Sequence, residues 1–253
     1  MILVFGGTTE GKQVAAMLDA LQTPYYYSTK TNVPFTGNGI AIHGALTKEQ
    51  IETFCKEKSI QYIVNASHPF ATQLHETIAS IAVEIPILRF EREFTERSSH
   101  TLVTYVDSFE MALQEFEKNK YTSLLALSGV QTIKKLTSYW KKHTTWFRIL
   151  DRDSSREIAK KANFPSEQLL YGYPQNKAEE IEVYNHLRPA AIFTKESGIN
   201  GKLEQKIAAA IITNIPIIIL TKPLVSNRYL CIHSIQELTT FFKTYSERTT
   251  KNT

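Results

Sequence analysis

The sequence predicts an α/β fold with two Rossmann-like domains, each containing a parallel sheet flanked by helices. Short runs rich in β-branched and aromatic residues alternate with amphipathic segments along most of the 253 residues, as in parallel α/β sheets. A polar and charged run at 93–100 interrupts this alternation, which then begins again. The length is sufficient for two small domains with separate cores. We therefore expect one domain over residues 1–97 and another over 98–253, with the active site in the cleft between them.

Five strands and two helices are expected in the first domain. The expected strands are Ile2–Phe5, Tyr25–Thr29, Ile40–His43, Gln61–Asn65 and Ile87–Arg89. Apolar residues at helical spacing predict a helix over Glu10–Leu21. Another helix is predicted over Thr47–Lys58, because Thr47 and Gln50 are residue types that satisfy the free backbone amides of a helix start.

The second domain repeats the alternation. The expected strands are Leu102–Val106, Ser123–Leu127, Thr145–Ile149, Ala190–Thr194 and Ile215–Leu220. The expected helices are Ser108–Lys118, Gln131–Tyr139, Asn176–Leu187, Ile199–Asn214 and Ser234–Tyr245. Within the fourth helix, Ile199, Leu203, Ile207 and Ile211 repeat every four residues and predict a buried stripe. The segment 215–220 is apolar on both faces, which is typical of an interior parallel strand.

Composition and charge exclude several classes of protein. No stretch approaches the ~20 apolar residues of a membrane-spanning helix, and the chain start lacks the basic segment and cleavage site of a signal peptide. The net charge of +4 and the pI of about 8.9 suit an anionic small molecule, whereas the dispersed positive charge does not indicate a nucleic-acid partner. Cys55 and Cys231 match no metal or redox spacing, which predicts reduced thiols and no metal site. We expect a cytoplasmic protein without membrane attachment, and the sequence predicts no particular oligomeric state.

A glycine-rich segment, Gly6-Gly7-Thr8-Thr9-Glu10-Gly11-Lys12, follows the first strand and begins the first helix. At such a position free backbone N–H groups and the positive end of the helix dipole can bind a phosphate. Two adjacent glycines and two threonines exceed what a tight turn requires, so we interpret the segment as nucleotide-binding. The spacing is also that of the P-loop of an NTP-dependent enzyme, but Gln13 stands where a Mg²⁺-binding serine or threonine belongs.

A dinucleotide fits the same strand, loop and helix, although the glycines do not follow the G-x-G-x-x-G spacing. The second strand ends in Tyr27-Ser28-Thr29-Lys30, without the carboxylate that commonly binds the ribose hydroxyls of NAD. Hydroxyl groups and a lysine suit a 2′-phosphate better. Thr29 and Lys30 therefore predict NADPH as the cofactor, with NADH as the alternative.

Polar loops follow two further strands. The segment Asn65-Ala66-Ser67-His68-Pro69-Phe70-Ala71 comes after the fourth strand, on the same sheet edge as the glycine-rich segment, so His68 could reach the same ligand. The segment Thr194-Lys195-Glu196-Ser197-Gly198-Ile199-Asn200-Gly201-Lys202 joins a strand to a helix in the second domain. Its glycines, serine and lysines predict a second anion site.

Taken together, these segments resemble the precorrin-6A reductase family of cobalamin biosynthesis, including its cobalt-precorrin-6A members. The resemblance is carried by the residues from Ile2 to Gly11, by Ser67-His68-Pro69-Phe70-Ala71, by Arg89-Phe90-Glu91-Arg92 and by Lys195-Glu196-Ser197-Gly198, and it covers nearly the whole chain. The family commonly has aspartate where this chain has Asn65. That difference removes a carboxylate from the loop that contains His68.

The resemblance implies hydride transfer from a nicotinamide cofactor to one double bond of precorrin-6A or its cobalt form, giving the 6B form. It implies that Gly6, Gly7, Thr8, Thr9, Glu10, Gly11, Ser67, His68 and Pro69 bind the cofactor, in addition to Thr29 and Lys30 predicted from the end of the second strand. It implies that Arg89, Arg92, Lys195, Glu196, Ser197, Gly198 and Lys202 bind the substrate, an anionic tetrapyrrole whose carboxylates arginine and lysine can recognise. Further basic candidates for the carboxylates are Arg148 and Arg228. His68 is the expected proton donor or cofactor-orienting residue, since histidine changes protonation near neutral pH.

Two other functions remain as alternatives at this point. One is an NTP-dependent enzyme that uses the glycine-rich segment as a phosphate cradle, which Mg²⁺-dependent ATP hydrolysis would reveal. The other is a non-catalytic nucleotide-binding or sensor protein, which would bind a cofactor without turning over any tetrapyrrole.

Overall fold

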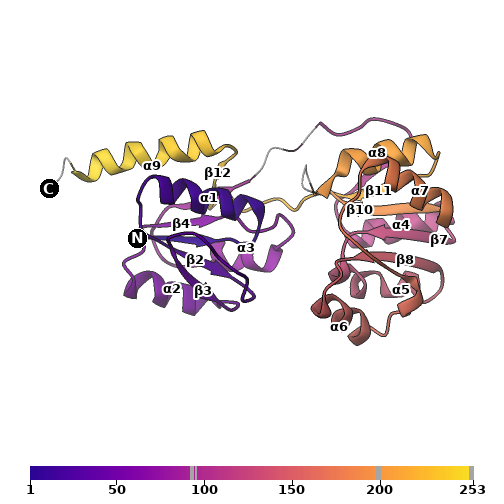
Figure 1. Ribbon diagram of the computed structural model, residues 1–253, viewed down its shortest axis with the longest axis horizontal. Coiled ribbons are helices and arrows are strands. Elements are labelled where there is room, and N and C mark those ends of the chain that lie inside the picture. Colours follow the sequence, from indigo (N-terminus) through magenta and orange to yellow (C-terminus); the bar gives the residue numbers. More distant parts are fainter. Residues whose placement is uncertain (92–93, 95, 198–200, 251–253) are drawn as a thin grey trace. The chain divides into compact units, whose positions relative to one another are not determined.

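The computed structural model describes residues 1–91, 94, 96–197 and 201–250, with side chains to residue 244. The chain forms two compact units, Met1–Glu93 with Pro223–Thr253, and Phe94–Lys222 (Figure 1). This division differs from the expected domains, 1–97 and 98–253, mainly in the last segment. Residues from 223 onward return to the first unit because β12 (Leu230–Ile232) pairs in parallel with β5 (Ile87–Phe90).

The first unit contains, within the described residues, a parallel sheet with the strand order β12-β5-β4-β1-β2-β3. The remaining strands are β1 (Ile2–Phe5), β2 (Tyr25–Thr29), β3 (Ile40–His43) and β4 (Tyr62–Asn65). Successive strands run outward from β1 in one direction through β3, and from β4 in the other direction through β12. The boundary between these directions lies between β1 and β4, and such a boundary is where open parallel sheets bind ligands.

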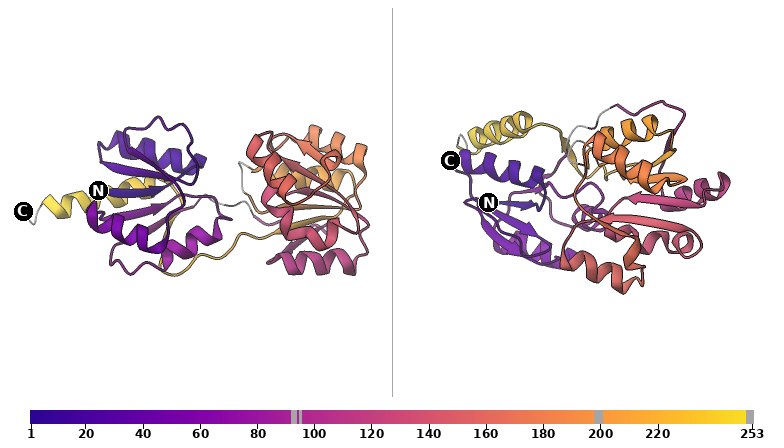
Figure 2. Two further views of the ribbon diagram at one scale, coloured as in Figure 1. Left: turned by 90° about the horizontal axis from the view of Figure 1, so that it is seen from below. Right: turned by 45° about the vertical axis from the view of Figure 1, so that its right-hand side comes forward.

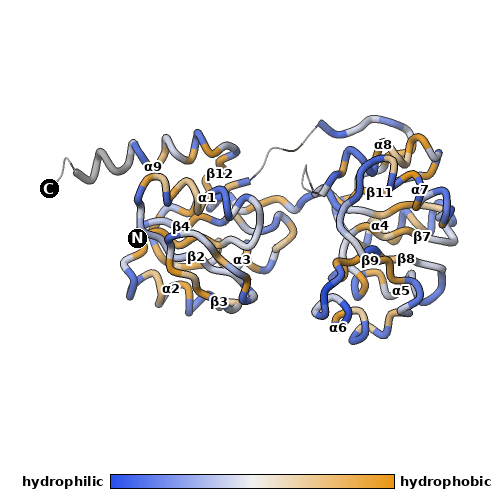
Figure 3. Tube along the Cα trace, in the orientation of Figure 1, coloured by the Kyte–Doolittle hydropathy of each residue, from blue (hydrophilic) through white to orange (hydrophobic). Residues whose placement is uncertain are grey.

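Helices cover both faces of this sheet (Figure 2). The helices are α1 (Thr9–Ala20), α2 (Lys48–Glu57), α3 (Thr72–Ala79) and α9 (Ile235–Thr250). One apolar cluster joins the sheet to α1 and α9 through residues such as Val14 and Leu238, and a second joins it to α2 and α3 through Ile51 and Ile78. Apolar residues accordingly concentrate on the strands and the inner faces of the helices (Figure 3).

The second unit has its own parallel sheet, of order β6-β11-β10-β7-β8-β9 among the residues that the structure describes. Its strands are β6 (Val103–Val106), β7 (Ser123–Leu127), β8 (Thr144–Ile149), β9 (Leu169–Tyr171), β10 (Ala191–Lys195) and β11 (Ile217–Leu220). The strand order changes direction between β7 and β10. β11 lies between β10 and β6 and is fully buried, which confirms the interior strand predicted near its position.

Helices also flank the second sheet. They are α4 (Phe109–Lys118), α5 (Thr137–Trp140), α6 (Asp153–Lys161), α7 (Lys177–Leu187) and α8 (Leu203–Ile212). Short 3-10 helices occur at Val130–Thr132, Lys134–Leu136 and Ser166–Gln168. One face of the sheet packs against α7 and α8, and Phe193 on the other face contacts α4 through Phe116.

The predicted buried stripe of the fourth helix is wrong in detail. In α8 the buried residues are Leu203, Lys206 and the alanine pair at 209–210, whereas Ile207 and Ile211 are only partly buried. Small alanine side chains let the helix approach the sheet closely, and the isoleucines then lie beside the contact. Ile199 lies outside the described residues.

Within the part of the chain that the structure describes, the elements α3, α6, β9 and β12 were not predicted, and neither was the 3-10 helix Ser166–Gln168. β9 and β12 have only three residues each, and both are edge strands of their sheets. The predicted helix Gln131–Tyr139 is wrong, because 3-10 helices at Val130–Thr132 and Lys134–Leu136 occupy most of that range and only the short α5 follows them. The remaining predicted elements are present, with ends shifted by a few residues, and α2 begins with the capping box of Thr47 and Gln50. Among the described residues, no helix has the length and hydropathy to span a membrane.

Candidate functional site

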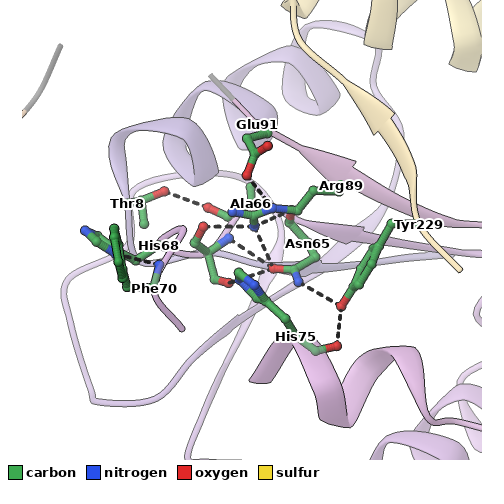
Figure 4. A network of polar contacts seen from close by, with 10 residues as sticks. Thr8, Asn65, Ala66, His68, Phe70, His75, Arg89, Glu91 and Tyr229 are labelled. Atoms are coloured by element: carbon green, nitrogen blue, oxygen red, sulfur yellow. Dashed lines mark hydrogen bonds and ion pairs between the residues drawn. The ribbon is translucent and has the colours of Figure 1, made fainter. Parts of the chain in front are cut away.

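The ends of β1 and β4 lie side by side in the first unit, and both predicted loops begin there. Phe5 at the end of β1 pairs with Asn65 at the end of β4. The Thr8 hydroxyl donates a hydrogen bond to the Ala66 carbonyl oxygen at 2.7 Å, which joins the two loops (Figure 4). The structure therefore brings the glycine-rich segment and the segment after β4 together at the point where the strand order changes direction.

The glycines of the first loop are required by close packing and by backbone conformation. A Cβ atom at Gly6 would lie 2.2 Å from the ring of Tyr27, and one at Gly11 would lie 2.7 Å from the Gly6 Cα atom. Gly7 has φ +87°, a left-handed conformation that glycine adopts without strain. The Gly7 amide donates to the Tyr27 hydroxyl at 3.0 Å, and this hydrogen bond stabilises the conformation of the loop.

The first turn of α1 presents backbone donors at this loop. Thr8 is the N-cap residue, and its hydroxyl accepts a hydrogen bond from the Gly11 amide at 3.0 Å. Amides of a first helical turn have no partner within the helix, and they lie at the positive end of the helix dipole. Gly7 and Thr9 are exposed, whereas Glu10 and Gly11 are buried. This arrangement suits a phosphate bound by backbone N–H groups.

The predicted ribose-binding residues at the end of β2 differ in accessibility. Thr29 is buried, and its hydroxyl donates to the Thr31 carbonyl oxygen or interacts with His43 Nδ1, both at 2.9 Å. Lys30 is exposed at the strand end. A ligand can therefore reach the ammonium group of Lys30, whereas the Thr29 hydroxyl is buried.

A buried network fixes the loop after β4 (Figure 4). Arg89 from β5 is only 1% exposed. Its Nη1 atom donates to the carbonyl oxygens of Asn65 at 3.0 Å and Ser67 at 2.9 Å, and its Nε atom lies 3.6 Å from a carboxylate oxygen of Glu91. Burial of the guanidinium favours a role in positioning this loop over the direct substrate contact that the sequence predicted for Arg89.

Asn65 connects the same loop to the returning C-terminal segment. Its Oδ1 atom accepts hydrogen bonds from the Ser67 amide and hydroxyl, at 3.2 and 2.7 Å. Its Nδ2 atom donates to the Tyr229 hydroxyl at 3.2 Å, and that hydroxyl donates to the His75 carbonyl oxygen at 2.7 Å. An asparagine side chain supplies both the acceptor and the donor that these contacts need. The buried Ser67 hydroxyl is thus part of the framework, and the neighbouring Pro69 is also buried.

His68 is exposed at the tip of this loop. Its Nδ1 atom accepts a hydrogen bond from the Phe70 amide at 3.2 Å. Because a backbone N–H can only donate, the proton of the neutral imidazole lies on Nε2. His68 can therefore act as a donor through Nε2.

His75 gives the first unit a specific dependence on pH. Burial lowers the pKa of His75 to about 4, with a further contribution from the Arg89 charge. Unfolding restores a pKa near 6.5, so the unfolded chain binds the proton first and stability falls as the pH decreases from about 6.5 towards 4. We expect His75→Gln to remove about 2 kcal/mol of the stability difference between pH 7 and pH 5. Urea titrations of the wild-type protein and of His75→Gln at pH 7 and pH 5 measure this difference. If both proteins lost the same free energy of unfolding between the two pH values, the expectation would be contradicted.

A second change of strand direction, in the second unit, also carries predicted residues. Thr194 on β10 pairs with Leu127 at the end of β7, so the loops after these strands start as neighbours. The loop after β7 includes Gly129, which has φ +83° and begins a 3-10 helix. Lys195 is the last residue of β10, and burial lowers its pKa to about 8. A partly desolvated ammonium group at this edge suits the binding of a carboxylate.

The remaining residues of the predicted substrate loop have different environments. Glu196 is buried, and a Cβ atom at Gly201 would overlap the Ser197 hydroxyl at 1.8 Å. Lys202 is exposed and precedes α8 with φ +49°. Arg92 and Gly198, also predicted to bind substrate, lie outside the described residues.

Sequence reasoning missed a buried ionic cluster beneath this edge. Arg148 on β8 donates to Glu180 on α7 at 2.5 Å, and the two side chains are 7% and 0% exposed. Lys206 on α8 is also buried and lies 3.4 Å from the Thr194 hydroxyl. Lys206 is thus a second buried cation near the Arg148–Glu180 pair, and the Glu180 charge favours its protonated form. Arg148 is therefore part of the interior and does not face a substrate, and the only sequence signal was a lysine among the alanines of α8.

Lys206 is expected to decrease stability near neutral pH. Burial, together with the charge of Arg148, lowers its pKa to about 8, although the Glu180 carboxylate opposes this shift. Because the folded state holds this proton less tightly than the unfolded chain, stability rises as the pH increases from about 8 to about 10.5. We expect Lys206→Met to stabilise the protein by about 1–3 kcal/mol at pH 7 and to flatten that rise. Thermal unfolding at pH 7 and pH 9.5 tests this, and a lower melting temperature for the variant at both values would contradict it.

Comparison with known proteins relates both units to one group of enzymes. The family model described as "Precorrin-6x reductase CbiJ/CobK" matches residues 1–243. A cobalt-precorrin-6A reductase of Synechocystis sp. is 30% identical over 234 residues, which is 85% of this chain and 86% of that protein. A cobalt-precorrin-6A reductase of Methanococcus maripaludis is 25% identical over 252 residues, or 96% and 98% of the two chains. The solved structure of CobK precorrin-6A reductase matches with a TM-score of 0.75 and 18% identity, covering 96% of each chain, which shows a shared fold.

Proposed function

The chain belongs to the precorrin-6x reductase CbiJ/CobK family, and from this premise we propose that it reduces cobalt-precorrin-6A with NADPH as the hydride donor. Membership makes the protein an oxidoreductase of cobalamin biosynthesis that uses a nicotinamide cofactor. The cobalt form is proposed because the relatives compared above carry that substrate in their names. Cobalt is then part of the substrate.

The observation that carries the proposal is the pair of loops at the direction change of the first sheet. The cofactor supplies the hydride when bound, and the protein positions the cofactor and the substrate and polarises the substrate. Close packing at Gly6 and Gly11 and the left-handed conformation of Gly7 shape the loop that leads into the start of α1, where a pyrophosphate would bind. Thr8 ties this loop to the segment that carries His68, so both contribute to one site.

The preference for NADPH is proposed to depend on Lys30. Its ammonium group is accessible at the end of β2, and the strand ends without a carboxylate that would repel a 2′-phosphate. We expect Lys30→Glu to raise the KM for NADPH by about tenfold or more while leaving the KM for NADH nearly unchanged. Lys58→Glu, with the same charge change at an exposed position of the same unit, is the control. Equal effects of the two variants would contradict this role.

His68 is proposed to donate a proton or to orient the nicotinamide through Nε2. A positioned general acid contributes on the order of 10²–10⁴-fold to a rate. His68→Gln is therefore expected to lower kcat by about 10²-fold if His68 donates the proton. A near-normal kcat with a raised cofactor KM would assign the orienting role instead.

The carboxylates of the substrate are proposed to bind Lys195 and Lys202 on the second unit. Lys195 is desolvated at the end of β10, and Lys202 is exposed on the same connection. Loss of either charge by substitution with glutamine should raise the KM for the macrocycle and leave the cofactor KM unchanged. Glu196 is left out of this proposed set, because its carboxylate accepts two hydrogen bonds from Arg97.

The deciding experiment is an anaerobic incubation of the purified protein with cobalt-precorrin-6A or precorrin-6A and with NADPH or NADH. Loss of the nicotinamide absorbance together with a shift of the macrocycle bands would establish the reaction, and the fastest of the four pairings would identify the substrate form and the cofactor. If nucleotide binds while both bands stay unchanged with every pairing, the protein is a nucleotide sensor with the fold of the family.

A further inference from the structure

The chain passes between its two units twice, once before Phe94 and once after Lys222. These two passages between the units, termed crossovers below, join the second unit at Phe94 and at Lys222. The Lys222 ammonium group lies 4.3 Å from the centre of the Phe94 ring, so the two crossovers meet where they join this unit.

One carboxylate contacts both crossovers. Arg97, three residues after the first crossover, donates to Glu196 from Nε at 2.8 Å and from Nη2 at 3.1 Å. The backbone amide of Lys222 donates to the same carboxylate at 2.9 Å. Burial alone would raise the pKa of Glu196, but Arg97 and the Lys222 amide outweigh it and lower the pKa. Glu196 is thus an ionised carboxylate. Its Oε1 atom accepts a hydrogen bond from Arg97, and its Oε2 atom accepts hydrogen bonds from Arg97 and from the Lys222 amide.

The contacts of Glu196 matter because apolar packing holds the segment 96–98, which follows the first crossover, only weakly against α8. A cavity of about 210 Å³ lies in the second unit, and its lining includes Arg97, Tyr105 and the Leu203 and Ile207 side chains of α8. The segment 96–98 therefore does not pack tightly onto α8. The Arg97 guanidinium lies 5.1 Å from the Tyr105 ring centre, which adds a cation–π contact to its carboxylate pair.

Glu196 also belongs to the connection that is proposed to bind substrate. It directly follows Lys195, and its amide continues the β10–β11 ladder by donating to the Leu220 carbonyl oxygen at 2.8 Å. A shift of this connection would therefore move the carboxylate and both crossovers together.

We propose that Glu196 is a positioning residue that clamps the two crossovers to the second unit, and so fixes the direction in which the chain leaves that unit during hydride transfer. The link to hydride transfer rests on the proposed function, whereas the clamp itself rests on the contacts of Arg97 and Lys222. This role replaces the direct substrate contact that the sequence predicted for Glu196.

The test measures the distance between the units in the full chain. Nitroxide labels are placed at the exposed positions Lys58→Cys and Glu157→Cys in a Cys231→Ser background, and distance distributions are recorded by double electron–electron resonance. Glu196→Ala is expected to broaden the distribution by about twofold, since hinge positions fix the relative orientation of domains. It is also expected to lower kcat by about tenfold or more with little change in the cofactor KM, because small misplacements of reactants slow a reaction strongly.

Two further variants keep the test decisive. Arg97→Ala removes only one side of the clamp, and because its side chain is 54% exposed the variant should fold and show the same broadening to a smaller extent. Glu115→Ala removes an ion pair of the same unit away from the crossovers and should leave the distribution unchanged. Unchanged distributions in Glu196→Ala and Arg97→Ala would overturn the proposal, even if their melting temperatures fall. A wild-type protein that reduces no macrocycle would refute the proposed function while leaving the comparison of distances valid.

Discussion

Replacing Arg89 with methionine is expected to lower the free energy of unfolding by about 3–5 kcal/mol, because it removes one partner of a buried ion pair. The guanidinium is almost fully buried beside Glu91, which is itself only 5% exposed. Without Arg89, a buried carboxylate loses its cation, and the carbonyl oxygens of Asn65 and Ser67 lose a donor. Urea unfolding at pH 7 measures the loss directly.

The same substitution should weaken cofactor binding, because Arg89 holds the loop that carries His68. We expect the KM for the nicotinamide cofactor to rise by about tenfold in Arg89→Met, because the carbonyl oxygens of Asn65 and Ser67 both lose the Nη1 donor that holds this loop. Arg228→Ala is the stability control, since that exposed side chain makes one hydrogen bond to the Val83 carbonyl oxygen. If Arg89→Met unfolds at the same urea concentration as Arg228→Ala, the buried network does not stabilise the unit as inferred.

The second large effect is expected in the other unit. Glu180→Gln should lower the free energy of unfolding by about 3–5 kcal/mol, because it leaves Arg148 buried without its anion while Lys206 remains nearby. The contrast with Lys206→Met is informative, since removing the buried Lys206 cation should stabilise the protein whereas removing the Glu180 carboxylate should destabilise it. The double variant is expected to recover part of the loss, because only one buried cation then lacks a partner.

Asp153→Asn provides the matched control for Glu180→Gln. Its carboxylate lies 3.7 Å from Arg156 and is fully exposed, so its loss should change stability only slightly. Equal melting temperatures for Glu180→Gln and Asp153→Asn would show that Arg148 is satisfied without Glu180. A double variant no more stable than Glu180→Gln would show that Lys206 does not interact with the pair.

In both units, the residues proposed to bind ligands are held in place by buried ones. In the first unit, exposed His68 lies on a loop that Arg89 and Asn65 fix from beneath. In the second, Lys195 ends a strand whose neighbour Thr194 contacts the buried Lys206. Substitutions of the buried residues should therefore change both stability and kinetic constants, whereas substitutions of the exposed ones should change mainly the kinetic constants.

The sequence by itself determined the parallel α/β architecture, most of its elements and the loops at which ligands are expected. These features depend on local patterns, such as the strand and glycines from Ile2 to Gly11, and on the rule that ligands bind at the carboxyl ends of parallel strands. The capping box at Thr47 is of the same kind, because all its groups lie within one helical turn.

Only the tertiary structure decided which polar residues are accessible and which are interior. Arg89 and Glu196 were expected to meet substrate, yet one positions a loop and the other contacts two crossovers. Their environments depend on partners distant in sequence: Asn65 meets Tyr229 across 164 positions, and Arg97 meets Glu196 across 99. The return of β12 to the first sheet has the same origin. The local sequence does not distinguish a solvated charged side chain from a buried one. Burial and pairing depend on the packing of segments that are distant in the sequence, and local patterns do not predict which of these segments meet.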